Sequence, residues 1–323
     1  MADPDFQIPA DLQPDQDDFS FDLRQTLNAI VGLRSFIPDD AYTAQTLGTE
    51  REGSGVVINE SGLIATIGYL VTEAETIWIN TNDGRAIPGH ALAYDQETGF
   101  GLVQALGKLE LPALEIGDSD QLSRGDRCIL AGSGGRQQAI KNRIVARQDF
   151  AGYWEYALDD ALFTSPPHPF WGGTGLIGEE GKLLGIGSLI IQRGNEGGRH
   201  DMNMVVPISL LSAILPDLTS YGRVDRPPRP WLGMFATESE DAVVVAGVAD
   251  SGPAAKAGVR AGDEILAVDG GDVNDLGMMW RQIWATGVAG TEVRLKLHRG
   301  SNVINLTVSS ADRASYLKAP KFH

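Results

Sequence analysis

Few side chains in this sequence have the types and spacing that catalysis needs. Ser165 and His168 lie three residues apart, and Thr174 follows in the same glycine-rich region. A hydroxyl beside an imidazole can act as an activated nucleophile, so these residues form one candidate hydrolytic site. Thr174 has no evident partner, however. We expect all three to be loop residues that make ordinary hydrogen bonds.

The sequence predicts no metal site and no organic cofactor. His90, His200, His298 and His323 are scattered, without the spacing of metal ligands. The glycine run at residues 131–135 lacks the Lys-Ser/Thr pair of a phosphate-binding loop. We interpret that run as a turn between strands.

Seven short motifs occur in a fixed order along the chain. They are GSGVVI (53–58), IATIGYLV (64–71), DQETGFGLV (95–103), LEIGDSD (114–120), HPFWGGTGL (168–176), GKLLGI (181–186) and WLGM (231–234). Their order and spacing resemble the HtrA/Deg family over about residues 25–312. The resemblance implies a mainly β chain, in which a trypsin-like double six-stranded β-barrel is followed by a PDZ domain.

The same resemblance locates the family's catalytic histidine, aspartate and serine on Tyr69, Gly99 and Gly172. Glycine at position 172 supplies no nucleophile, and a phenol with a pKa near ~10 is a poor base at neutral pH. Gly99 has no carboxylate to orient a base. Loss of even one triad member typically costs about 10⁴-fold in rate. The resemblance therefore predicts a pseudoprotease with no catalytic residues.

Two aromatic residues, Phe170 and Trp171, replace part of the family's oxyanion loop. Two interpretations are open: they fill the former specificity pocket, or they form a new apolar binding surface. Gly172 and Gly173 are expected to preserve a backbone turn that other residues would strain.

The segment from Trp231 to Met234 resembles the carboxylate-binding loop of a PDZ domain. Successive N–H groups of Leu232, Gly233 and Met234 can form a nest for a terminal carboxylate. The strand that begins at Met234 would then pair with the incoming peptide. Two further stretches, residues 251–259 and 260–270, match this domain closely.

A helix is expected to flank the peptide groove. Leu276, Trp280 and Ile283 share one helical face, which core packing explains, and Met279 and Gln282 are then the groove residues. The predicted peptide-binding set is Trp231, Leu232, Gly233, Met234, Phe235, Met279 and Ile283. A PDZ fold can also exist with its groove occupied internally.

Composition excludes several classes of protein. Residues 1–227 contain 16 basic and 32 acidic side chains, and residues 228–323 contain 10 and 11, so the net charge of −17 lies almost wholly in the first part. Such a surface repels nucleic acid and anionic membranes. The single cysteine, Cys128, excludes an intramolecular disulfide. No apolar run reaches the length of a membrane span.

Hydrophobic periodicity and turn residues give the expected domain organisation. A helix is predicted over residues 21–35, strands of a first barrel over 53–107, strands of a second barrel over 112–213, and helices over 208–218 and 276–285. The expected parts are a flexible acidic arm (1–19), a degenerate protease domain (20–221), a Pro-rich linker (222–230), a PDZ domain (231–312) and a tail (313–323).

These observations favour a peptide-binding adaptor or chaperone-like scaffold. The alternatives are a serine-type endopeptidase that uses Thr174, or Ser165 with His168, and a structural subunit of a larger complex. The expected partners are peptide or protein C-termini. By analogy with the family, a homotrimer or larger complex is also expected. The lack of a signal sequence in the first residues predicts a cytoplasmic location, or a periplasmic one if a leader was removed.

Overall fold

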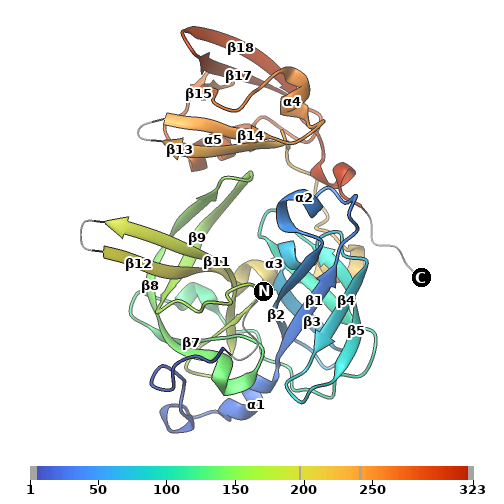
Figure 1. Cartoon of the computed structure of the whole chain (residues 1–323), viewed down its shortest axis with the longest axis vertical. Helices are drawn as coiled ribbons and strands as arrows, with labels where there is room; N and C mark the ends of the chain where they lie inside the picture. Colours follow the sequence, from blue (N-terminus) through green and yellow to red (C-terminus); the bar gives the residue numbers. More distant parts are fainter. Residues whose placement is uncertain (1–5, 196–197, 240–241, 319–323) are drawn as a thin grey trace. The chain divides into compact units, whose positions relative to one another are not determined.

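The structure is a computed structural model that describes residues 6–195, 198–239 and 242–318, and it consists mainly of β-strands (Figure 1). Internal contacts divide it into two units. The first contains Met1–Gln148, Asp160–Val224 and Lys318–His323, and the second contains Asp149–Asp159 and Asp225–Leu317. The expected mainly β architecture, two barrels and a smaller sheet, is confirmed.

The first barrel is a closed sheet in the order β1-β2-β3-β6-β5-β4. Its strands are β1 (Ile30–Phe36), β2 (Glu50–Val57), β3 (Leu63–Ile67), β4 (Thr76–Asn80), β5 (Ala86–Tyr94) and β6 (Phe100–Ala105), with the short helices α2 (Ala44–Leu47) and η2 (Gly68–Leu70) between them. β4 alternates exposed and buried residues, as expected for a strand with one face in the core.

The helix predicted over residues 21–35 is wrong in its second half. Helix α1 covers only Leu23–Asn28, with Asp22 as its N-cap, and the chain then enters β1. Val31 and Leu33 are buried at every second position, and β1 pairs with both β2 and β4. The period of two in this segment, not the helical one, decides its structure.

The second barrel is closed in the order β10-β11-β12-β9-β8-β7. Its elements are η3 (Ser119–Gln121), β7 (Arg127–Ala131), η4 (Gly135–Gln138), β8 (Ala139–Gly152), β9 (Tyr156–Ser165), β10 (Gly175–Ile177), β11 (Leu183–Asn195), β12 (Gly198–Pro207) and α3 (Ile208–Tyr221). Helix α3 contains Pro216 and ends at Tyr221, three residues beyond the predicted end at Leu218, which packs in the core.

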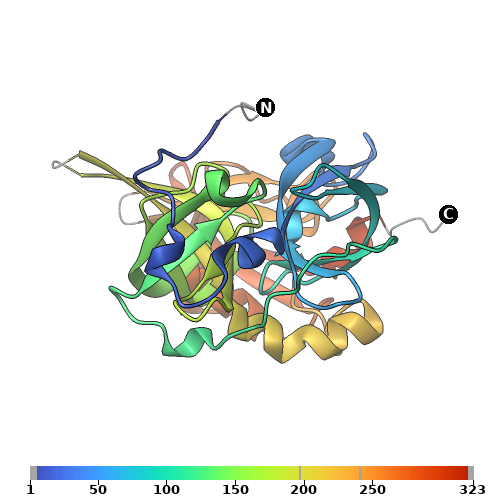
Figure 2. The same ribbon diagram turned by 90° about the horizontal axis from the view of Figure 1, so that it is seen from below.

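The N-terminal segment was expected to be a flexible arm, but its described part packs on the second barrel (Figure 2). The N–H of Ile8 donates to the carbonyl of Gln137 at 2.9 Å, and the Leu12 carbonyl accepts from Lys141 at 2.8 Å. Ile8 is buried in the barrel's core cluster, and η1 (Gln16–Asp18) follows. Residues 1–5 and 319–323, the ends of the expected arm and tail, lie outside the described residues.

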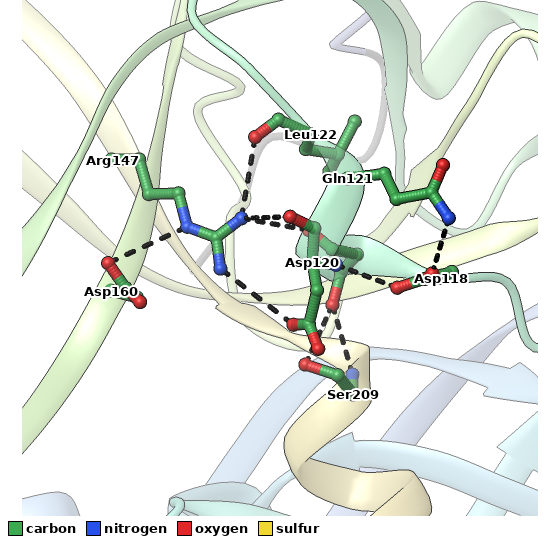
Figure 3. A network of polar contacts seen from close by, with 8 residues as sticks. Asp118, Asp120, Gln121, Leu122, Arg147, Asp160 and Ser209 are labelled. Atoms are coloured by element: carbon green, nitrogen blue, oxygen red, sulfur yellow. Dashed lines mark hydrogen bonds and ion pairs between the residues drawn. The ribbon is translucent and has the colours of Figure 1, made fainter.

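Arg147 joins several elements of the second barrel (Figure 3). Its guanidinium donates to the carbonyls of Asp120 at 2.9 Å and Ser119 at 3.2 Å, and its Nε lies 3.6 Å from an Asp160 carboxylate oxygen. The Ser119 hydroxyl accepts from the N–H of Ser209 at the start of α3. These bonds tie η3 to β8, β9 and α3.

The second unit contains a sheet in the order β13-β14-β15-β17-β18. Its elements are β13 (Met234–Ser239), β14 (Ala242–Val248), α4 (Pro253–Ala257), β15 (Glu264–Val268), β16 (Gly271–Asp272), α5 (Leu276–Ala285), β17 (Glu292–Arg299), β18 (Asn302–Ser309) and η5 (Arg313–Tyr316). Trp231 bridges to Ala311, and its ring packs on Tyr316. The described part of the expected tail is therefore ordered.

Candidate functional site

Tyr69 and Gly172 face each other in the first unit. A Cβ built on Gly172 would lie 2.7 Å from the Tyr69 hydroxyl oxygen, and that hydroxyl donates to the carbonyl of Ser188 at 2.9 Å. Two residues 103 positions apart in the sequence are thus brought together where a nucleophile and its base would have to meet.

Gly99, the third predicted position, contacts the backbone segment that carries Tyr69. Its carbonyl accepts from the N–H of Gly68, the residue before Tyr69, at 2.7 Å, and its φ of +84° favours glycine. The carboxylate of Asp95 holds the turn by accepting from the N–H and hydroxyl of Thr98 at 2.8 and 2.7 Å. The structure therefore brings all three predicted positions together, and they are occupied by two glycines and a tyrosine.

The environment of Tyr69 keeps its phenol neutral. Burial raises the pKa of Tyr69 well above its usual range. At neutral pH a smaller fraction of its side chain is therefore the basic phenolate than for a free phenol. The buried Arg51 donates to the carbonyls of Tyr69 at 2.7 Å and Thr72 at 3.0 Å, and burial lowers its pKa to about 10. Arg51 remains a cation that fixes the backbone beside the phenol.

His168 cannot serve as a base for the alternative site. It is fully buried; Nε2 lies 3.0 Å from the Gln138 carbonyl, and the N–H of Phe170 donates to Nδ1 at 3.1 Å. A carbonyl only accepts, so these partners place the proton on Nε2. Burial lowers the pKa of His168. Both nitrogens are occupied, which leaves none to accept a proton from Ser165.

Thr174 is equally constrained. Its side chain is buried, and its hydroxyl donates to the Trp171 carbonyl at 2.8 Å. The predicted turn is also present: Gly173 has φ of +75°, and a Cβ there would lie 1.8 Å from the Ser54 carbonyl oxygen. Thr174 therefore supports the backbone of the loop, and its hydroxyl proton is already engaged there.

The loop also lacks a free pair of oxyanion donors. In trypsin-like sites these donors are the N–H of the nucleophile residue and that of the residue two before it. The second position corresponds to Phe170, whose N–H is engaged with His168. The half-buried Phe170 ring packs edge-on against Phe6 with 5.2 Å between ring centroids.

The N–H nest predicted in the PDZ loop is formed in the second unit. The N–H groups of Leu232 and Met234 both point to the carboxyl group of Glu155, at 3.1 and 2.8 Å. Gly233 has a φ of +70°, and a hydrogen bond from its N–H lowers the pKa of this carboxyl group. The nest thus binds a carboxyl group that belongs to the chain itself.

Glu155 was missed by the sequence analysis, because nothing in its local pattern marks it as a ligand. It is buried and has a φ of +56° at the turn between β8 and β9. Burial raises its pKa to about 7, against the opposing effect of the three N–H groups and of Arg313. Only the fold brings this turn to the nest.

The helix residues assigned to the groove lie elsewhere. Met279 is fully buried in the core cluster with Leu276, Trp280 and Ile283. Positions i, i+3, i+4 and i+7 form one helical face, so Met279 shares the core face that the sequence analysis assigned to the other three. Phe235 is half-buried, with its ring 6.2 Å from that of Tyr153.

Among the described residues, no group of three or more His, Cys, Asp or Glu side chains is placed to hold a metal ion. Within the same ranges, no helix combines the length and apolar character needed to cross a bilayer. Cys128 is buried and unpaired as a thiol, and burial raises its pKa to about 12.

Comparison with known proteins agrees with this architecture. Residues 53–186 match the trypsin-like peptidase domain, and residues 230–309 match the PDZ domain. The chain is 29% identical over 281 residues to a probable periplasmic serine endoprotease, DegP-like, of Halomonas elongata, covering 80% of this chain and 56% of that protein. It is 28% identical over 292 residues to the periplasmic pH-dependent serine endoprotease DegQ of Escherichia coli, covering 86% and 63%.

The solved structure of the HtrA-type protease AlgW with a decapeptide has the same fold. It superimposes with a TM-score of 0.53 at 23% identity, over 92% of this chain and 98% of that one. The chain spans about three-fifths of the length of its two curated relatives above.

The names of these relatives correct one prediction. Both curated proteins are called periplasmic, which contradicts the cytoplasmic location expected from the first residues. That expectation depended on the start of the sequence alone, which is a weak guide to location. Two matched domains and similarity along most of the chain support the assignment: the chain combines a trypsin-like peptidase domain with a PDZ domain and is homologous to the DegP, DegQ and HtrA serine endoproteases.

Proposed function

We propose that this chain is a pseudoprotease of the HtrA type, which binds the C-termini of peptides or proteins through its PDZ domain and does not hydrolyse them. It acts as an adaptor or chaperone-like scaffold. Because its relatives are named periplasmic, the proposed place of action is the periplasm.

One observation is the main support for the proposed loss of hydrolysis. At the meeting point of the nucleophile and base positions, a Cβ on Gly172 would lie 2.7 Å from the Tyr69 hydroxyl oxygen, so the space of a serine side chain is taken by a neutral phenol. Acyl transfer needs a nucleophile, a base and an orienting group acting as a unit, and the three positions provide none of them.

Two features of the adjoining loop support the same proposal. The Phe170 N–H is engaged with His168, and the Phe170 ring packs against Phe6, which favours the interpretation that the aromatic pair fills the former pocket. Donors that are already bonded do not stabilise a developing oxyanion without rearrangement.

Peptide binding is supported by the PDZ loop. Its N–H groups converge on one carboxyl group, which is the arrangement by which such loops capture a chain end. Strand β13 follows directly and lies at the edge of its sheet, where an added strand can pair.

A fluorophosphonate probe tests the loss of the nucleophile. The full chain is incubated with the probe beside a DegQ-type protease as positive control, and labelling is followed by intact mass. We expect labelling of the control and none of this chain. A covalent adduct on any serine or threonine of this chain would refute the proposal.

A further inference from the structure

The turn between β8 and β9 contacts the PDZ fold as a bound peptide would. Residues Asp149–Asp159 belong to the same unit as Asp225–Leu317. The carboxyl group of Glu155 occupies the nest, with its oxygens 3.1 Å from the Leu232 nitrogen and 2.8 Å from the Met234 nitrogen. This is the position of a terminal carboxylate in PDZ recognition.

The backbone before Glu155 pairs with the edge of the sheet. The N–H of Ala236 in β13 donates to the carbonyl of Tyr153 at 2.9 Å. Tyr153 is two residues before the residue whose carboxyl group fills the nest, so the spacing reproduces strand addition by a peptide with its last residue in the loop. The indole N–H of Trp280 also donates to the Gly152 carbonyl at 3.0 Å.

Exposed ion pairs lie on either side of the turn. Arg281 of α5 pairs with the carboxylates of Asp149, at 2.7 Å, and Asp159, and each of these solvent-exposed pairs contributes little to the stability of the docked turn. The Trp154 and Tyr156 rings stack with centroids 5.6 Å apart. A preorganised segment of the same chain competes at a high effective concentration, commonly in the millimolar range for short tethers.

We propose that residues 152–155 are an internal ligand of the PDZ domain, with Glu155 as a mimic of a chain-terminal carboxylate, and that an external C-terminus binds by displacing them. This inference depends on the proposed peptide-binding function. The partner it fits is an extended chain end with a free α-carboxylate. An aromatic or apolar residue is favoured two positions before that end, where Tyr153 now meets Phe235.

A synthetic probe follows from the internal ligand itself. A fluorescent hexapeptide copies residues 150–154 and ends in valine with a free carboxylate, and a second version ends in an amide. Binding is measured by fluorescence anisotropy to the full-length wild type, Glu155→Ala and Asp159→Asn. The last variant alters a carboxylate on the same turn that pairs with Arg281 and does not contact the nest.

The proposal expects Glu155→Ala to bind the carboxylate peptide at least tenfold more tightly than the wild type, Asp159→Asn to stay within about twofold of the wild type, and the amide peptide to bind none of them. Measurable and equal affinity in the wild type and Glu155→Ala would overturn the internal ligand while leaving peptide binding intact. No binding by any folded form would instead refute the proposed function.

Amide hydrogen exchange tests occupancy of the nest without any peptide. We expect the N–H groups of Leu232, Met234 and Ala236 to be protected in the wild type and in Asp159→Asn, and to exchange at least tenfold faster in Glu155→Ala. Unchanged exchange in Glu155→Ala, with the fold retained by circular dichroism, would contradict the docked turn.

Discussion

At position 172 the space for a side chain is already occupied. The Tyr69 hydroxyl oxygen lies 2.7 Å from where a Cβ would stand, while the next Tyr69 atom is 3.6 Å away. The phenol and the glycine therefore fit each other. A serine at this position would require the Tyr69 side chain to shift.

A double-mutant cycle measures this fit. Gly172→Ala alone should lower the free energy of unfolding by about 1–3 kcal/mol, because a well-packed site must shift to admit a methyl group. In a Tyr69→Phe background the close contact is gone, so the same substitution should cost less than about 1 kcal/mol. Urea unfolding of the four proteins checks the prediction, and equal costs in the two backgrounds would contradict it.

The neighbouring Gly173 should be the least replaceable residue of the loop. A Cβ there would lie 1.8 Å from the Ser54 carbonyl oxygen, at a φ of +75°. We expect Gly173→Ala to cost about 3 kcal/mol or more. The matched control is Gly84→Ala: φ is +85° with no atom within 4 Å, so only backbone strain of about 1–2 kcal/mol applies.

Thermal unfolding of these two variants distinguishes a steric clash with the Ser54 carbonyl from backbone strain alone. A midpoint shift that is clearly larger for Gly173→Ala supports the close backbone approach. Similar shifts in both variants would show that the loop relaxes around position 173.

Among the elements, the turn between β8 and β9 should make peptide binding depend on pH. The docked Glu155 carboxyl group has a pKa of about 7 against an ordinary value of 4.5, so it takes up a proton on docking between these values. Docking is then most favourable below pH 4.5 and weakens as pH rises through 7. The positive charge of Arg313 in η5 opposes this rise in the pKa of Glu155.

The affinity for an external C-terminal peptide should therefore rise at least tenfold from pH 5 to pH 8, because an α-carboxylate free in solution, with a pKa near ~3.5, is already ionised at both pH values. Glu155→Gln should remove most of this dependence. Titration of the anisotropy signal against pH checks it. A pH profile that is the same in Glu155→Gln and the wild type would assign the dependence to another group.

Some helices and strands can be predicted from their residues more accurately than others. The span of α5 was predicted at the observed bounds, because its apolar residues have a clear helical period. Residues 21–35 were mispredicted, since short apolar runs fit both helix and strand. The three positions that correspond to the family's triad, and the nest, were predicted from the resemblance. Glu155 was not, because its role depends on a contact between residues 77 positions apart.

For the whole molecule, charge restricts the partners. The net charge of −17 is concentrated in residues 1–227, which disfavours polyanions and favours neutral or basic peptides. We expect no complex with a 20-base-pair DNA duplex at about 0.15 M salt, where phosphate contacts from basic side chains dominate affinity. A shifted band at micromolar protein in a gel assay would contradict this.

The central claim is that a hydrolase framework persists here without hydrolysis. The most direct measurement is the release of acid-soluble fragments from casein by the full-length chain, over a day, beside a DegQ-type protease. The account predicts fragment release by the control and none above background for this chain. Fragment release by this chain that is abolished by a serine-hydrolase inhibitor would contradict it.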